Sequence, residues 1–320
     1  MKSLKTEEFG KIEEYILEYS GILLSRVPKL GVSERILKHM ASLKVDSVDS
    51  YLDLLKNPGN LAIRDGLISL VTVNESYLFR NPSQFNFLAN ELLPKLGEKK
   101  RDLKKRIYCW SAGCSTGEEL YSMAFIVNWF QEKNPGLSFS LLGSDINTRS
   151  LEKARLGKYR RRSVRASTRM ILERFNFPYL RETPDGYEIE DEIREKVNFS
   201  FLNLRNLCVL KTFPKMDIIF CRNVLIYFEE SFKVQLLTAF VELLLPGGHI
   251  FLGETESLPE KFKKLELVKC KGCYCYRKVE EQEPQKDAAE GKRSSKSAKI
   301  QENDRQVPEA GGSPRGRVEA

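Results

Sequence analysis

The chain has 320 residues, of which 30% are charged, and its formal net charge of +8 favours acidic partners without identifying them. No apolar run approaches the ~20 residues that a membrane span needs, and the N-terminus lacks the apolar segment of a signal peptide. The seven cysteines are an odd number and lie mostly in apolar runs, so we expect reduced thiols in a cytoplasmic protein. The length allows roughly two domains.

The first seventy residues predict an all-helical region. Apolar residues recur at helical spacing in three stretches, and Ser33 stands where the N-cap of the second helix is expected. This second helix and its flanks carry several basic side chains, among them Arg26, Arg35 and Lys38. The pattern fits either an ordinary solvated face or a docking surface for an acidic protein helix, and the charges alone do not separate the two.

From residue 97 onward strands alternate with helices, which predicts a mostly parallel sheet with helices on both faces. The first unit is a strand over 107–110, a loop of small residues and a helix from Glu118; such units bind nucleotide-like ligands at the carboxyl end of the strand. The spacing Gly113-x-x-x-Gly117 matches neither the dinucleotide fingerprint nor a P-loop, and Glu118 and Glu119 would repel a pyrophosphate. A ligand without phosphate and with a positive charge fits better, and S-adenosylmethionine is such a molecule.

Polar residues also follow the next strands of the predicted sheet. Asp145 comes just after the strand over 137–143, where a carboxylate can accept both hydroxyls of a ribose or can cap the following helix. Asn203 and Leu204 follow the strand over 197–201, where they could contact an adenine edge or form a simple turn. A third group follows the strand over 216–221, where it could cap the strand end or offer an aromatic face to a sulfonium: Arg222, Asn223 and Tyr227.

Residues 159–200 interrupt this rhythm with an arginine-rich turn, a helix near 170–175 and a hairpin at Pro184-Asp-Gly186. Near the end, Cys270-x-x-Cys273-x-Cys275 has no second cysteine pair and few histidines to complete a zinc site, so we expect no metal. Residues 280–320 hold nine acidic and eight basic side chains with few aliphatic ones, which predicts a disordered tail. We therefore predict a helical domain over 1–70, a main domain over 71–279 with an insert at about 159–196, and a tail over 280–320.

Five strings of the chain resemble chemotaxis receptor methyltransferases of the CheR type, which methylate glutamate side chains of chemoreceptors with S-adenosylmethionine. The resemblance covers roughly residues 10–278 in the right order. The strings are Asn74-Glu-Ser-Tyr-Leu-Phe-Arg80, Trp110-Ser-Ala-Gly-Cys-Ser-Thr-Gly-Glu-Glu119, Ser144-Asp-Ile146, Phe220-Cys-Arg-Asn-Val-Leu-Ile-Tyr-Phe228 and Pro246-Gly-Gly248 to Ser257. The resemblance implies an α/β, class I S-adenosylmethionine-dependent methyltransferase fold, Rossmann-like, with an N-terminal helical domain and a small inserted β-hairpin subdomain.

The resemblance also implies the site residues. Those expected to bind the cofactor are Asn74, Ser76 (where Thr is usual), Arg80, Gly113, Glu119, Asp145, Asn203, Leu204, Arg222, Asn223 and Tyr227. Arg80 would hold the incoming carboxylate and Tyr227 would line the methyl group, with S-adenosylhomocysteine as the product. The expected partner is the cytoplasmic helical region of membrane chemoreceptors, docked on Arg26, Arg35 and Lys38, and we expect a monomer that neither inserts into membranes nor binds nucleic acid.

Two alternatives stay open, a methyltransferase of the same fold with another acceptor and a non-catalytic scaffold that binds the cofactor. The chain also departs from the family pattern twice. Gly253-Glu-Thr-Glu-Ser257 stands where the family often has Gly-His-Ser-Glu-Ser. The predicted hairpin has Gly186 alone, whereas some members grip a tethering peptide of the receptor with a glycine-rich loop there.

Overall fold

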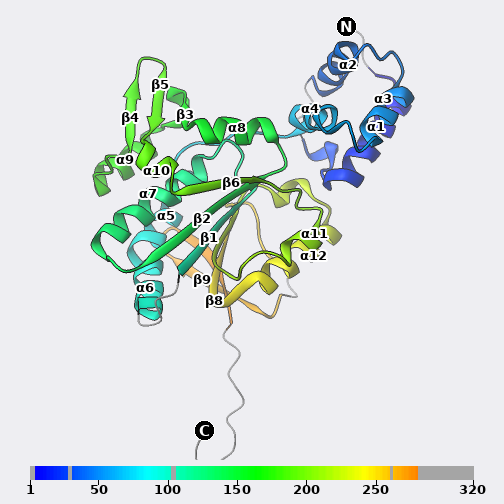
Figure 1. Cartoon of the computed structure of the whole chain (residues 1–320). Helices are drawn as coiled ribbons and strands as arrows, with labels where there is room; N and C mark the ends of the chain where they lie inside the picture. Colours follow the sequence, from blue (N-terminus) through cyan, green and yellow to red (C-terminus); the bar gives the residue numbers. More distant parts are fainter. Residues whose placement is uncertain (1–3, 28–30, 102–105, 260–261, 280–320) are drawn as a thin grey trace, which may run out of the picture. The chain divides into compact units, whose positions relative to one another are not determined.

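The computed structural model describes residues 4–27, 31–101, 106–259 and 262–279, so the predicted tail over 280–320 lies outside the described residues (Figure 1). The N-terminal part consists of α1 (Thr6–Ser20), the short η1 (Leu24–Arg26), α2 (Val32–Ser42), α3 (Val48–Lys56) and α4 (Leu61–Val71). Their apolar stripes pack together around Ile16, Ile36 and Tyr51, all fully buried. Within the described residues, no helix has both the length and the apolar composition to span a membrane.

The start of α2 differs from the prediction. Its N-cap is Gly31, which has a positive φ of 75°, and the Ser33 hydroxyl instead accepts a hydrogen bond of 2.9 Å from the amide of Leu4. The prediction of Ser33 as the N-cap is therefore wrong. The donor to the Ser33 hydroxyl lies 29 positions upstream in the chain, so the local sequence pattern gives no sign of this bond.

The large sheet has seven strands in the order β6-β2-β1-β7-β8-β10-β9. Its strands are β1 (Arg106–Ala112), β2 (Ser138–Asp145), β6 (Val197–Phe201), β7 (Met216–Cys221), β8 (Leu244–Leu252), β9 (Leu265–Cys270) and β10 (Cys273–Lys278). The first five in this order pair in parallel, and β10 pairs antiparallel with β8 and β9. The prediction of an α/β protein with a mostly parallel sheet and a two-stranded end is confirmed.

Helices cover both faces of the sheet because its strands are apolar on both sides. The helices that follow β1, β2 and β7 are α7 (Glu118–Lys133), α8 (Thr148–Leu156) and α12 (Glu230–Leu243), and the short α11 (Leu207–Leu210) lies beside α12. Along β1, Cys109 belongs to the core that includes α7, whereas Trp110 packs edge-on against Phe240 of α12. This alternation is the period-2 pattern of a strand buried on both faces.

Residues 82–101 contain helical structure that the sequence analysis does not predict. It comprises α5 (Pro82–Phe87), the π-helical η2 (Leu88–Leu92) and α6 (Leu93–Arg101). A π-helical turn shifts the apolar residues away from helical spacing, and Pro94 stands inside the segment, so the periodic signal is broken.

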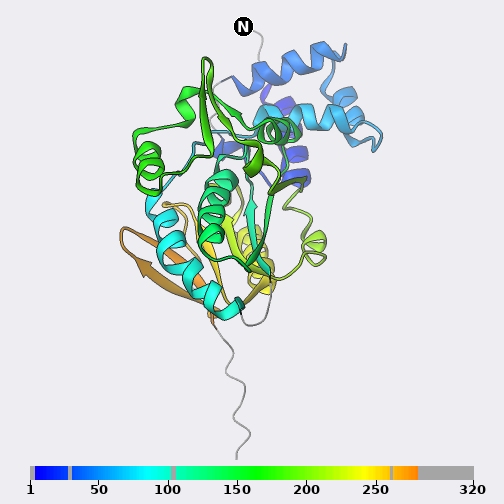
Figure 2. The same cartoon turned by 60° about the vertical axis from the view of Figure 1, so that its left-hand side comes forward.

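The insert forms a second, three-stranded sheet in the order β3-β5-β4, from β3 (Lys158–Tyr159), β4 (Leu180–Thr183) and β5 (Gly186–Ile189). It also contains η3 (Arg161–Ser163), α9 (Ala166–Phe175) and α10 (Asp191–Arg194), and the β4–β5 hairpin extends away from the large sheet in both views (Figures 1 and 2). A Cβ on Gly186 would lie 2.0 Å from the carbonyl oxygen of Tyr159. This glycine is therefore needed for the close approach of β3 to β5.

Candidate active site

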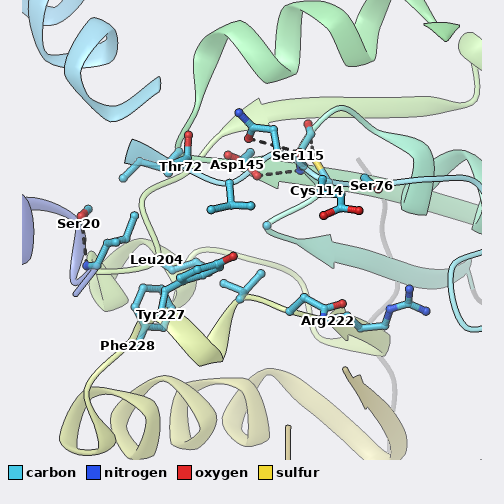
Figure 3. Close-up of a pocket in the computed structure, with 18 of the residues that line it drawn as sticks. Ser20, Thr72, Ser76, Cys114, Ser115, Asp145, Leu204, Arg222, Tyr227 and Phe228 are labelled. Carbon is cyan, nitrogen blue, oxygen red and sulfur yellow. Dashed lines mark hydrogen bonds between the residues drawn. The ribbon is translucent and has the colours of Figure 1, made fainter. Parts of the chain in front are cut away.

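One pocket opens at the carboxyl ends of β1, β2, β6 and β7, and it encloses about 960 Å³ when the space at its open mouth is counted. All the residues predicted to bind the cofactor line it: Asn74, Ser76, Arg80, Gly113, Glu119, Asp145, Asn203, Leu204, Arg222, Asn223 and Tyr227. Figure 3 shows Asp145 and Ser115 on one side of the pocket, facing Tyr227 and Phe228 on the other.

The loop after β1 is shaped by hydrogen bonds to the end of β2. The amides of Gly113 and Cys114 both donate to the carbonyl oxygen of Ser144, at 2.8 and 2.9 Å. Gly113 has a positive φ of 79°, and a Cβ on it would lie 2.5 Å from a methyl group of Val224. Glycine is therefore required here because two loops of the pocket wall touch at this point.

The carboxylate of Asp145 is held by the backbone of both neighbouring loops. One oxygen accepts from the amide of Ser115 and the other from the amide of Asn147, each at 2.8 Å. The N-cap of α8 is Asn147, whose side chain accepts from the amide of Ser150, so the alternative that Asp145 caps this helix is wrong. Burial raises the pKa of Asp145, while these amide donors act in the opposite direction. Each carboxylate oxygen keeps further acceptor capacity toward the pocket.

Glu119 and Arg222 form a buried ion pair, with the guanidinium Nε 2.8 Å from a carboxylate oxygen. The Ser111 hydroxyl donates to the other oxygen of Glu119 at 2.7 Å, and Arg222 Nη1 donates to the side-chain oxygen of Gln84 at 3.0 Å. Burial raises the pKa of Glu119 and lowers that of Arg222, and each partner opposes the shift of the other. The two predicted cofactor residues therefore bind each other, and the charge of Glu119 is balanced from within the wall.

The amide of Asn203 is occupied by protein partners. Its nitrogen donates to the carbonyl oxygen of Tyr19 at 2.6 Å, and its oxygen accepts from the amide of Arg205 at 3.0 Å. The side chain thus joins α1 to the loop after β6, and it also lines the pocket. The second N–H and second lone pair of this amide, together with backbone groups around Leu204, stay available to a ligand at this point.

The segment that carries Tyr227 is joined to the helical region. The amide of Leu23 donates to the carbonyl oxygen of Tyr227 at 2.9 Å, and Ile22 pairs with Phe228 as an antiparallel bridge. Arg26, predicted to lie on the docking face, donates from Nη1 to the carbonyl oxygen of Phe228 at 2.6 Å. Arg26 is nonetheless exposed, and both of its side-chain hydrogen bonds use the same nitrogen. Burial raises the pKa of Tyr227, which keeps the phenol neutral near neutral pH.

The other two predicted docking residues lie on α2. Arg35 and Lys38 are both exposed, and Lys38 forms an ion pair of 2.8 Å with Glu34 one turn earlier on the same helix. An exposed pair of this kind leaves the lysine accessible to a partner.

Glu256 is a site residue that sequence reasoning did not identify. It is 4% exposed, and one carboxylate oxygen accepts from the amides of Asn223 and Gly253, both at 2.7 Å, while the other accepts from the amide of Ile226 at 3.2 Å. Asn223 has a positive φ of 60°, and these bonds hold its loop in that conformation. The available signal was the string around residues 253–257, in which this glutamate matches the family pattern although the histidine does not.

Residues 74–80 form the remaining wall and are fastened at their C-terminal end. The amide of Leu78 donates to the carbonyl oxygen of Ser163, the Thr168 hydroxyl donates to the carbonyl oxygen of Leu78, and the amide of Phe79 donates to the Ser122 hydroxyl. Asn74 and Glu75, at the other end, are exposed. Arg80 is half-buried at the pocket and donates from Nη1 to the carbonyl oxygen of Glu75 at 3.2 Å.

Comparisons with known proteins agree with this architecture. Residues 74–273 match a family model described as "CheR methyltransferase, SAM binding domain". The chemotaxis protein methyltransferase of Vibrio parahaemolyticus is 32% identical over 84% of this chain and 95% of its own. The chemotaxis protein methyltransferase of Escherichia coli is 32% identical over 83% of this chain and 89% of its own.

Proposed function

The chain belongs to the CheR methyltransferase family and carries its S-adenosylmethionine-binding domain, and we propose that it methylates glutamate side chains of chemoreceptors. The predicted family, the class I methyltransferase fold, the methyltransferase activity and the cofactor are confirmed. The observation that supports the proposed substrate is that the matched relatives, named as chemotaxis protein methyltransferases, align over most of both chains. The products would be glutamyl methyl esters and S-adenosylhomocysteine.

The chemistry of the pocket fits this cofactor. Asp145 presents acceptor oxygens at the end of β2, where they would take the two ribose hydroxyls, and the glycine-containing loop leaves room beside it. Tyr227 and Phe228 supply aromatic surface on the facing side, suited to a sulfonium. When bound, the cofactor supplies an activated methyl group together with its own leaving group.

The protein then has to position and desolvate a carboxylate. A glutamate side chain is already ionised near neutral pH, so the site needs no general base. Arg80 lies at the pocket with part of its guanidinium unengaged by Glu75, and we assign it to hold the incoming carboxylate. Tyr227 stays neutral and would line the path of the methyl group while excluding water.

We propose that the cytoplasmic helical region of the chemoreceptor docks against α2. We also propose that the protein acts as a monomer in the cytoplasm. Reversing Arg35 and Lys38 to Glu should slow receptor methylation by up to about thirtyfold, because each of the two exposed charges contributes at most ~1 kcal/mol. The effect should shrink as salt is raised, since screening acts over ~8–10 Å at physiological ionic strength. Equal rates for the wild type and this variant at low salt would remove α2 from the interface.

The experiment that tests the substrate class is the alkali lability of the product. Protein, methyl-labelled cofactor and a receptor cytoplasmic fragment are incubated, and the labelled fragment is then treated with mild base. Hydroxide attacks a glutamyl methyl ester and releases methanol, so the label should become volatile, whereas methylated amines and nucleobases survive. Glu→Ala changes at the labelled positions of the fragment should abolish labelling. Label that remains on the protein through alkali would refute carboxyl methylation while leaving the methyltransferase fold intact.

A further inference from the structure

The positive charge of this protein is concentrated in one segment, residues 148–169, here called the basic strip. It holds nine basic side chains and one acidic one, so its net charge of +8 is as large as that of the whole chain. The strip runs through α8, β3 and η3 into the first turn of α9. Such a concentration of charge in 22 residues is typical of a surface that meets an acidic partner.

All nine basic side chains of the strip are exposed. Three of them form ion pairs, Arg161 with Glu182, Lys158 with Glu188 and Arg165 with Glu75. Among the residues that the structure describes, Arg149, Arg160 and Arg162 have no acidic side chain within ion-pair distance. The strip therefore keeps most of its charge available to a partner.

The strip begins and ends at the wall of the active-site pocket. Asp145 and Ile146, which line the pocket, come directly before Asn147 and α8. Farther along, the Tyr159 hydroxyl donates to the carbonyl oxygen of Thr116 in the loop after β1, and Arg165 pairs with Glu75, another lining residue. In Figure 1, α8 spans the distance between α4 and the small sheet. A partner lying on the strip would therefore lie beside the pocket wall.

We propose that the basic strip docks the acidic helical surface that flanks the glutamate being methylated. The inference rests on the proposed function, because it assigns the strip to the same chemoreceptor substrate. Two exposed apolar side chains, Leu156 within the strip and Met170 directly after it, are 57% and 69% exposed and suit the apolar residues of a protein helix. The strip's aromatic residue, Tyr159, is buried, so the strip lacks the exposed rings on which nucleobases stack.

The test compares two triple variants that remove the same charge. The strip variant carries Arg149→Gln, Arg160→Gln and Arg162→Gln. The control carries Lys263→Gln, Lys264→Gln and Lys271→Gln, three exposed lysines in and beside the β9–β10 hairpin, at the sheet edge opposite β6. Three quantities are measured: cofactor affinity by calorimetry, binding of a receptor cytoplasmic fragment without cofactor, and kcat/KM for methylation of that fragment at low and high salt.

The strip variant should bind the fragment about tenfold more weakly and lose about tenfold in kcat/KM at low salt, with the loss shrinking as salt rises. Its cofactor affinity and the behaviour of the control should match the wild type. Equal fragment binding by the strip variant and the wild type would overturn the docking inference even if methylation proceeds. If the strip variant binds the fragment more weakly but the wild type forms no alkali-labile methyl product, the proposed function is refuted and the docking inference stands. Strip-dependent binding of single-stranded RNA that exceeds binding of the fragment would also overturn the inference.

Discussion

Two walls of the pocket differ in the burial of their ion pairs. One, here called the strand-end wall, follows the carboxyl ends of the strands and includes Glu119 and Arg222, and the other is formed by residues 74–80. At the strand ends, the side chains of Arg222 and Glu119 are 2% and 12% exposed and form an ion pair. On the other wall, the side chains of Arg165 and Glu75 form an ion pair while 48% and 76% exposed. A buried pair is costly to break, whereas an exposed one contributes little. The strand-end wall is thus held by a pair that is costly to break, whereas the exposed end of the other wall is held by a pair that contributes little.

The largest effect is expected from breaking the buried pair. Arg222→Met should lower the free energy of unfolding by about 3–5 kcal/mol, because Glu119 would be left buried without its cation. Urea unfolding measures this loss. Adding Glu119→Gln to the same chain should restore part of the stability, since the unpaired charge is then gone. A single variant as stable as the wild type would show that the strand-end wall does not depend on this pair.

The second-largest effect is expected from Asp145→Ala, which should weaken cofactor binding. Hydrogen bonds to a charged acceptor are worth roughly 1.5–3 kcal/mol, so S-adenosylmethionine should bind about 10- to 100-fold more weakly by calorimetry. The carboxylate also holds two loop amides, so the melting temperature must be recorded alongside. An unchanged affinity in a folded variant would reduce Asp145 to a residue that shapes the loop.

Glu256→Gln should cost about 1–3 kcal/mol of unfolding free energy, because an amide group cannot accept from all three backbone donors that the carboxylate serves. Cofactor affinity should fall with it, since the loop of Asn223 lines the pocket. Glu254→Gln, an exposed change two residues away, is the matched control. If both variants behaved alike, the buried carboxylate would have no special part in holding the wall.

The smallest effect is expected at the exposed end of the wall formed by residues 74–80. Glu75→Gln removes the exposed pair with Arg165 and should change the free energy of unfolding by less than about 1 kcal/mol. Urea unfolding beside Arg222→Met gives the direct comparison. A loss as large as that of the buried pair would mean that the two walls are held equally firmly.

Local patterns predicted the strand–helix order and the polar residues at the strand ends, whereas Asn74, Ser76 and Arg80 were predicted from the family resemblance alone. Small residues after β1 and polar residues after β2, β6 and β7 gather at the same end of the sheet, because the carboxyl ends of parallel strands lie side by side. The hydrogen-bond partners of these residues within the protein could not be predicted, because those partners are distant in the chain. Asn203 bonds to Tyr19 across 184 positions and Arg222 to Gln84 across 138. The π-helical turn over 88–92 likewise has no periodic signature.

The contacts of Leu23 and Arg26 with the Tyr227 segment bear on how such enzymes could be recombined. Ser20, Ile22 and Val27 line the same pocket as Asp145, so the N-terminal helices supply part of the cofactor wall. A chimaera that exchanges the first 70 residues to redirect the choice of receptor would also exchange that wall. The proposed docking helix α2 and the pocket are therefore not separable modules in this chain, and a graft would have to carry the residues around 20–27 with the segment over 222–228.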